Sequence, residues 1–208
     1  MVKALKLKIL TPLRPVVVEN HLANVIARAF LFWGISLALI ACAPNPSATL
    51  SPMSSSETVT VRLEISPGQL GEPQKVKRVV KSDEEWAKQL TPSQYHVCRS
   101  KGTERPFCGT LLDNKKTGVY TCVCCDLPLF ASNSKFNSGT GWPSFFQPIA
   151  KENVLNIVDN SHGMERIEIV CARCDAHLGH VFEDGPKPTG LRFCLNSESL
   201  NFHETPNK

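Results

Sequence analysis

Cysteine is the residue type in this sequence with the most chemistry to offer. There are nine cysteines, at positions 42, 98, 108, 122, 124, 125, 171, 174 and 194. Four of them form two Cys-x-x-Cys units, Cys122 with Cys125 and Cys171 with Cys174. Each unit can hold a metal ion from a tight turn, and two units complete a tetrahedral set of thiolates. Zinc suits this set, because it binds thiolates well and has no redox chemistry.

Two other readings of these four cysteines remain open. A set of disulfides is plausible in an exported protein, and a single Cys-x-x-Cys unit is typical of thiol oxidoreductases. We favour zinc because two matched units rarely arise by accident. Four thiolates leave no open position for water, so we expect one structural zinc ion per chain rather than a catalytic one.

Cys194 lies in a segment that predicts a reactive thiol. Residues 191–197 read Leu-Arg-Phe-Cys-Leu-Asn-Ser, which alternates apolar and polar side chains as a half-buried strand does. Arg192, Cys194 and Asn196 then share one face, and the opposite face is apolar. A fixed cation lowers the pKa of a neighbouring cysteine and favours the nucleophilic thiolate. The alternative is a buried cysteine that acts as a small apolar residue.

Two further segments carry side chains that suit a catalytic pocket. His177 and His180 enclose Leu178 and Gly179, and a bulge at the glycine would bring both imidazoles to one pocket. There they would position and protonate a substrate oxygen; a solvent-exposed pair is the alternative. Residues 139–145, Gly-Thr-Gly-Trp-Pro-Ser-Phe, predict a rigid turn. Its Trp142 belongs either to the core or to the wall of a pocket for a small apolar group.

The elements that must position these side chains are mostly short. Fifteen prolines and twelve glycines indicate a fold rich in strands and turns. Capping boxes at Ser82/Glu85 and Thr91/Gln94 predict two short helices. Residues 119–123, 166–171 and 191–195 have the pattern of strands. We expect the folded domain to span residues 77–208, after a flexible linker.

The N-terminal part predicts export. Residues 29–41 form an uncharged apolar run of thirteen residues, which is too short to span a membrane but fits an export signal. The run ends in Leu-Ile-Ala-Cys42, which resembles the lipid-attachment motif of bacterial lipoproteins. We therefore expect residues 1–42 to be a signal segment and Cys42 to be a lipid anchor; an uncleaved membrane anchor is the alternative. A flexible linker is expected over residues 43–76, with a strand within 59–65.

The net charge of +4 comes from this N-terminal segment. Residues 1–42 hold five of the 23 basic side chains and one of the 19 acidic ones, which leaves 18 of each sign. A chain that is otherwise neutral gives no electrostatic reason to expect nucleic acid as a partner.

Taken together, these motifs resemble the methionine sulfoxide reductase B family. The resemblance extends from about Ser82 to Phe202. It rests on Gly-Thr-Glu-Arg-Pro-Phe at 102–107, the 139–145 turn, Ser-His-Gly-Met at 161–164, His-Leu-Gly-His-Val-Phe at 177–182, and residues 192–197. The family implies a mainly β fold, with two antiparallel β-sheets, a few short helices and a four-cysteine zinc site far from the catalytic centre.

The resemblance also implies an activity and residue roles. The family reduces methionine-R-sulfoxide to methionine, in proteins or as the free amino acid. By position, Cys194 is the nucleophile, Arg192 supports its thiolate, and Trp142 and Phe182 bind the substrate. The remaining catalytic residues, His177, His180 and Asn196, line the side of the sulfoxide oxygen. The attacking cysteine becomes a sulfenic acid, which a second thiol resolves as a disulfide.

The second thiol is where this sequence departs from many family members, which have a resolving cysteine at the position of Thr140. Cys98 and Cys108 are the candidates here, and Cys98 is favoured; direct reduction by an external thiol is the alternative. The implied partners are oxidised proteins and a thioredoxin-like or other thiol reductant, with the chain acting as a monomer. The rival function is a non-catalytic zinc-knuckle binding module. We expect the protein in the periplasm or held by lipid at a membrane, and otherwise in the cytoplasm.

Overall fold

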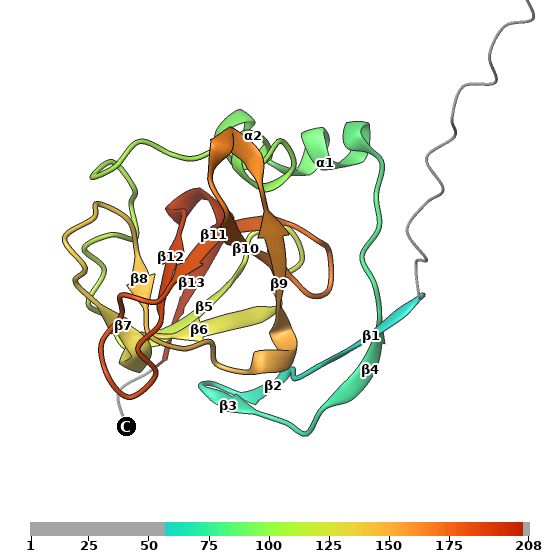
Figure 1. The fold of residues 1–208 in the computed structure, drawn as a ribbon. Coiled ribbons are helices and arrows are strands. Elements are labelled where there is room, and N and C mark those ends of the chain that lie inside the picture. The colour runs from blue at the N-terminus through green and yellow to red at the C-terminus, as the bar shows by residue number, and fades with distance from the viewer. Residues whose placement is uncertain (1–56, 206–208) are drawn as a thin grey trace, which may run out of the picture. The chain divides into compact units, whose positions relative to one another are not determined.

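The computed structural model describes residues 57–205, apart from the side chain of His162, and this part is mainly β (Figure 1). It contains two short α-helices, α1 (Asp83–Gln89) and α2 (Pro92–Cys98). The strands are β1 (Thr58–Val61), β2 (Glu64–Ser66), β3 (Gln69–Leu70), β4 (Gln74–Lys77), β5 (Gly118–Cys122), β6 (Pro128–Ala131), β7 (Lys135–Phe136), β8 (Ser144–Phe145), β9 (Val154–Asp159), β10 (Arg166–Cys171), β11 (His177–Phe182), β12 (Arg192–Leu195) and β13 (Leu200–Glu204). Single 3-10 turns, η1 (Ser132–Ser134), η2 (Lys151–Asn153), η3 (Ser161–Gly163) and η4 (Ser197–Ser199), connect several of them.

Two antiparallel sheets form the body of the domain. The larger sheet has six strands in the order β7-β8-β12-β11-β10-β9, and the smaller has three in the order β13-β5-β6. Two small two-stranded sheets, β1-β4 and β2-β3, lie beside them. This arrangement confirms the predicted mainly β fold with two antiparallel sheets and few helices.

An aromatic cluster joins the two sheets. Tyr120 on β5 and Phe130 on β6 both contact Phe145 on β8, with ring centroids 5.0 and 4.8 Å apart. Phe130 also contacts Phe193 on β12 at 5.7 Å. Offset and edge-on aromatic contacts of this kind stabilise a core beyond the area they bury. The apolar face of β12 therefore packs inward, which leaves its other face, with Cys194, for the site.

The two helices begin where the sequence predicts. Ser82 and Glu85 form a reciprocal capping box before α1, and Thr91 and Gln94 form one before α2. Each box satisfies two backbone donors that a helix start otherwise leaves unpaired. Trp86 on α1 is buried, and both helices lie at one end of the domain (Figure 1).

The predicted linker differs from the structure where the two can be compared. Residues 58–77 form β1 to β4, and β1 pairs with β4 over four residue pairs. Val61 is fully buried, and the side chain of Asn153 accepts a hydrogen bond from the Arg62 amide and donates one to its carbonyl. The part of the predicted linker after residue 57 is therefore folded onto the domain, because it supplies core and backbone pairing.

The predictions for residues 1–56, including the export signal and the lipid anchor at Cys42, lie outside the described residues. Within the described part, no helix has the length and apolar character that crossing a bilayer would need.

Candidate active site and metal-binding site

Cys194 is half-buried on β12, directly opposite His180 on the neighbouring strand. The register pairs Cys194 with His180 and Phe193 with Val181. Directly opposed residues of antiparallel strands have their side chains about 5 Å apart on the same face. On the other side, Ser144 of β8 pairs with Cys194, and the Thr140 hydroxyl lies 4.0 Å from its sulfur. The predicted alternation of β12 is confirmed, since Phe193 and Leu195 belong to the core.

A bulge in β11 brings the two histidines together, as the sequence predicts. The pairing of β10 with β11 shifts where Ile169 meets Gly179 and Val170 meets His177, so Leu178 is the extra residue. The two imidazole rings consequently lie 5.4 Å apart instead of on opposite faces. Gly179 is needed at this point, because a Cβ there would lie 2.0 Å from the Cys194 carbonyl oxygen.

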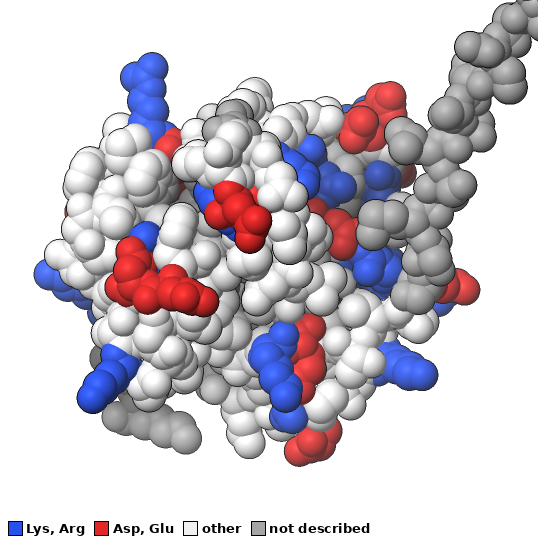
Figure 2. Space-filling view, viewed as in Figure 1, with Lys and Arg blue, Asp and Glu red and all other residues white. Residues whose placement is uncertain are grey.

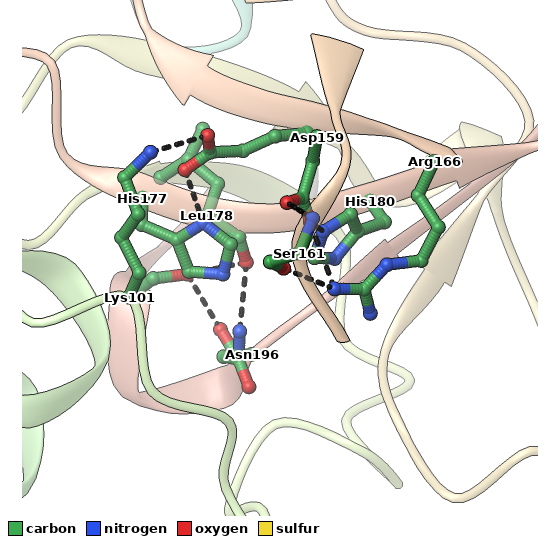
Figure 3. Close-up of polar contacts among 10 residues, drawn as sticks. Lys101, Asp159, Ser161, Arg166, His177, Leu178, His180 and Asn196 are labelled. Carbon is green, nitrogen blue, oxygen red and sulfur yellow. Dashed lines mark hydrogen bonds and ion pairs between the residues drawn. The ribbon is translucent and has the colours of Figure 1, made fainter. Parts of the chain in front are cut away.

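A carboxylate holds each imidazole in place (Figure 3). Nδ1 of His177 lies 2.7 Å from Glu168, which also forms an ion pair with Lys101. Nε2 of His180 lies 2.8 Å from Asp159. Burial lowers the pKa of His177, so its ring is neutral and its Nδ1 proton points at Glu168. Hydrogen bonds from Ser161 and His180 lower the pKa of Asp159.

Nε2 of His177 is the unusual atom of this arrangement. It is buried, and it has no hydrogen-bond partner among the described residues. Buried polar atoms are almost always bonded to protein or to ordered water. In the neutral tautomer set by Glu168 this nitrogen is an acceptor, so it can take a hydrogen bond from a ligand or a water.

Burial and Arg192 act in opposite directions on the Cys194 thiol. Burial raises its pKa, whereas the charge of Arg192 and hydrogen bonds from Thr140, Arg192 and Ser144 lower it. Burial is the larger effect, so the net pKa is above its ordinary value. The prediction of a lowered pKa is therefore wrong for the free protein, although the predicted cation is present.

Arg192 is itself fixed by two contacts. Its Nε and Nη2 atoms donate to the two carboxylate oxygens of Asp184, at 2.8 and 2.9 Å. Its guanidinium carbon also lies 4.4 Å above the centre of the Phe182 ring. A bidentate pair and a cation–π contact restrict the guanidinium to one position.

A small pocket opens above the thiol. Its volume is about 140 Å³. Six of its lining residues belong to the motifs identified in the sequence: Trp142, Gly179, His180, Phe182, Cys194 and Asn196. His177 does not line the pocket itself, but its ring contacts that of His180, which does. The structure therefore gathers residues from the predicted turn, β11 and β12 around one cavity.

Residues 102–107 close this pocket from a third side. The indole nitrogen of Trp142 donates to the Glu104 carbonyl at 3.1 Å. The Glu104 amide donates to the Asn196 side chain, and its carboxylate accepts from the amides of Ser197 and Glu198. Glu104 thus joins the Trp142 turn to the segment that follows Cys194.

The two cysteines considered for resolution have opposite environments. Cys98 is 2% exposed at the end of α2, with its thiol next to that of Cys124. Cys108 is exposed and directly follows Phe107, whose amide donates to the Gly141 carbonyl. A Cβ on Gly141 would lie 2.9 Å from the Phe107 amide nitrogen, so the Cys108 loop packs closely on the Trp142 turn. Of the two, only Cys108 is on a loop beside the pocket.

The four cysteines of the two Cys-x-x-Cys units meet at one point. Their sulfur atoms all lie within 4.8 Å of one another, with Cys122 3.6 Å from Cys174 and Cys125 3.5 Å from Cys171. A disulfide requires about 2.05 Å, so these are separate thiols. Tetrahedral zinc at about 2.3 Å from each sulfur spaces the sulfurs by roughly 3.8 Å, which fits the cluster.

Two similar turns carry the four cysteines, one from each sheet. Cys122 ends β5 and Cys171 ends β10, and each is followed by a turn that closes on its own carbonyl, through the amides of Asp126 and Asp175. Burial and the neighbouring thiols raise the pKa of Cys171 well above its ordinary value. A bound cation would reverse this effect, because it stabilises thiolates. The donor set therefore suits a metal.

The orienting carboxylates were not found from the sequence. Asp159 and Glu168 lie on β9 and β10, and no local motif ties them to the histidines. Glu168 did carry a signal, since an acid between Ile167 and Ile169 in a buried strand requires a partner. Lys101 and Asp184 were also missed, because no local motif ties Lys101 to Glu168 or Asp184 to Arg192.

A half-buried thiol opposite one of two carboxylate-held imidazoles, with a four-cysteine cluster elsewhere, defines a thiol-dependent enzyme with a structural metal site. Comparison with known proteins gives the family. Residues 90–204 match the model of the SelR domain. The chain therefore belongs to the SelR domain family.

Named relatives cover the same region. A peptide methionine sulfoxide reductase MsrB from Hahella chejuensis is 60% identical over 126 residues, which are 61% of this chain and 91% of the relative. The protein of that name from Methanosarcina barkeri is 63% identical over 126 residues, 61% of this chain and 89% of the relative. That from Pseudomonas putida W619 is 58% identical over 127 residues, covering 61% and 96%.

Proposed function

We propose that this chain reduces methionine-R-sulfoxide to methionine in oxidised proteins, with Cys194 as the nucleophile. Its family and the names of its relatives indicate this reaction. The observation that carries the assignment of the nucleophile is the position of Cys194, opposite His180 and at the base of a pocket that Trp142 walls. A zinc-knuckle binding module does not account for that pocket.

In this reaction the sulfur of Cys194 attacks the sulfoxide sulfur, and the oxygen passes to the cysteine. A thiol and a sulfoxide give a sulfenic acid and a thioether, so atoms and protons balance without an outside proton. Because burial keeps the Cys194 thiol protonated in the free protein, the thiol itself supplies the proton that the oxygen needs. Arg192 favours the thiolate once that proton leaves.

His177 and His180 move this proton in our proposal. His180 lies across from the thiol, and the ring of His177, 5.4 Å from that of His180, has its Nε2 free to accept a hydrogen bond. Asp159 and Glu168 keep both rings oriented and stabilise an imidazolium when it forms. Asn196, held by the Glu104 amide and the Leu178 carbonyl, fixes the oxygen side of the pocket.

Trp142 and Phe182 supply the apolar side of the pocket. Trp142 is held by its hydrogen bond to the Glu104 carbonyl, and Phe182 is covered by Arg192. A volume of about 140 Å³ suits one thioether side chain rather than a larger group. We assign the terminal methyl group of the substrate to the indole face of Trp142.

Cys108 is the resolving thiol in our proposal. Its thiol displaces water from the Cys194 sulfenic acid and forms a disulfide, which a thioredoxin-like or other thiol reductant then reduces. The exposed loop that carries Cys108 packs on the Trp142 turn, whereas Cys98 is buried beside Cys124. This reverses the preference for Cys98 drawn from the sequence.

Variants of the two cysteines test this assignment. One equivalent of methionine sulfoxide should give a Cys108–Cys194 disulfide in the wild type and in Cys98→Ser, as read by peptide mapping. Cys108→Ser should still form methionine in a first turnover but lose thioredoxin-driven turnover, because no disulfide forms. A disulfide that persists in Cys108→Ser, or disappears in Cys98→Ser, would contradict the assignment.

The metal at the four-cysteine cluster is zinc in our proposal. Cys122, Cys125, Cys171 and Cys174 would hold it, and four thiolates leave no position for substrate. When bound, the metal would cross-link the ends of β5 and β10 and would take no part in the reaction.

For the location we keep the proposal of export. The apolar run and Cys42 support a protein in the periplasm or attached by lipid to a membrane, where it would repair envelope proteins. The alternative is a cytoplasmic protein. Labelling with a radioactive fatty acid, with Cys42→Ser as control, distinguishes them.

An assay with separate epimers tests the function. Wild type should reduce the R epimer of a chromophore-tagged methionine sulfoxide and leave the S epimer unchanged, and Cys194→Ser should be inactive on both. Activity on the S epimer alone, or activity that survives the substitution, refutes the proposal.

A further inference from the structure

Besides the sulfoxide pocket, the structure has a groove of about 590 Å³, and Trp142 lines both. Its walls come from Phe107, the 112–116 loop and residues 132–143. No step of the reaction proposed above uses it.

Trp142 lies in the wall of both cavities. It lines the sulfoxide pocket of about 140 Å³ and also the groove of about 590 Å³. The smaller cavity is the size of one side chain. The groove is in the range of about 300–1,000 Å³ that ligand-binding clefts occupy. A polypeptide whose oxidised methionine enters the pocket must place its neighbouring residues on the surface around it, and the groove begins there.

The lining of the groove combines aromatic, amide and charged side chains, the charged ones being Lys115, Lys116, Lys135 and Asp113. Phe107, Phe136 and Trp142 give it aromatic walls, and Asn114 and Asn137 add amide groups. Phe107 is 68% exposed, so its ring is accessible to a ligand in the groove. An extended polypeptide presents both amides and apolar side chains, and so matches this lining.

Among the lysines that line the groove within the described residues, one has an ammonium group with no ion pair or hydrogen bond. Nζ of Lys135 donates to the carbonyls of Leu112 and Asn114, and Lys116 forms an ion pair with Glu204. Lys115 has no ion pair with any residue in the described part of the chain. It therefore offers an acidic side chain of a ligand a partner without displacing another contact.

We propose that this groove binds the polypeptide segment that flanks the oxidised methionine, with Lys115 favouring an acidic residue there. The inference rests on the proposed reductase function. A protein reductant is the other candidate occupant, but it needs access only after the disulfide has formed. The substrate polypeptide, in contrast, must be held while its oxidised side chain occupies the sulfoxide pocket, and Trp142 lines both that pocket and the groove.

Two substrates and two variants test the proposal. The small substrate is N-acetyl-methionine-R-sulfoxide N-methylamide, and the large one is a nine-residue peptide with the sulfoxide at its centre, flanked by glutamate or by lysine. Leu112→Trp fills the groove, and Lys115→Glu reverses its free charge. Lys75→Glu, on the exposed face of β4 outside the groove, is the matched control.

Leu112→Trp should lower kcat/KM for both peptides about fivefold or more, by raising KM, and leave the small substrate within about twofold. Lys115→Glu should lower kcat/KM for the glutamate peptide by about fivefold and raise it for the lysine peptide, as expected for a partly exposed charge pair. Lys75→Glu should change neither.

Equal effects on peptide and small substrate, or no effect on either, would overturn the proposal. A loss confined to thioredoxin-driven turnover, with an unchanged single-turnover rate on peptides, would assign the groove to the reductant instead. Failure of the reductase function is distinguishable, because the wild type would then not reduce the small substrate at all.

Discussion

At the scale of the residue, the thiol of Cys194 is protonated in the free protein because burial outweighs Arg192. A half-buried cysteine with a raised pKa is protected from adventitious oxidants, which react with the thiolate. The guanidinium nevertheless lowers the pKa of the thiol relative to the same site without that charge. The site therefore releases its proton when a substrate oxygen is present to accept it.

Replacing Arg192 with Met tests this balance, since Met keeps most of the apolar stem. Because Arg192 lowers the pKa of Cys194, its loss should raise that pKa further and lower the thiolate fraction near pH 8 by about tenfold. The rate of iodoacetamide alkylation of Cys194 as a function of pH reports this directly, in a Cys108→Ser background that removes the exposed thiol. An alkylation profile that does not move would show that Arg192 has no part in ionising the thiol.

The sequence predicted these residues unevenly. Cys194, Arg192 and Asn196 could be placed on one face because strand alternation is local. The carboxylates Asp159 and Glu168 could not be paired with the histidines, because that pairing depends on the register of β9, β10 and β11. The net pKa of Cys194 was also out of reach, since burial depends on the whole fold.

At the scale of the element, the bulge in β11 determines the geometry of the site. The extra residue, Leu178, is fully buried and turns both histidines toward the same region. Gly179 then lets β11 approach the backbone of Cys194. The strand that carries the histidines and the strand that carries the thiol pair over four residue pairs, and glycine at 179 permits their close approach at one end of this pairing.

Gly179→Ala should disrupt that contact. The added Cβ would meet the Cys194 carbonyl oxygen at 2.0 Å, and a backbone atom cannot move aside as a flexible side chain can. We expect a loss of about 3 kcal/mol in the free energy of unfolding, measured by urea denaturation, and a loss of activity in the molecules that remain folded.

Gly190→Ala is the matched control for this change. Gly190 has φ of +73° but no atom within 4 Å of an added Cβ, so only backbone strain of about 1 kcal/mol is expected. Equal destabilisation by the two substitutions would mean that the approach of β11 to β12 is not what requires glycine at 179.

Elements with local signals were predicted well, and those without them were not. Capping boxes and apolar alternation identified α1, α2, β10 and β12 closely. The strands β1 to β4 are two to four residues long and were assigned mostly to a linker. Strands this short have too few residues to show a period, and they are stabilised by pairing and by the burial of Val61.

At the scale of the whole molecule, the four-cysteine cluster links the two sheets. Forty-five residues separate the two units in the sequence, from Cys125 to Cys171, and the sheets place their sulfurs within contact. The spacing predicted a connection between distant segments, and the structure identifies these segments as the ends of β5 and β10.

Removing the metal should therefore lower the stability of the whole domain. Elemental analysis of Cys174→Ser should find less than about one zinc per chain. Its free energy of unfolding should be about 4 kcal/mol lower, as expected when a metal present far above its Kd no longer binds. Cys124→Ser, which leaves the four ligands intact, is the control. Full zinc content and unchanged stability in Cys174→Ser would contradict the structural role.

The most direct test of the account is a single turnover without any reductant. Cys108→Ser, mixed with excess methionine-R-sulfoxide, should release about one methionine per chain and leave a sulfenic acid that dimedone traps at Cys194. No methionine, or a dimedone adduct on a different cysteine, would show that the oxygen does not pass to this sulfur.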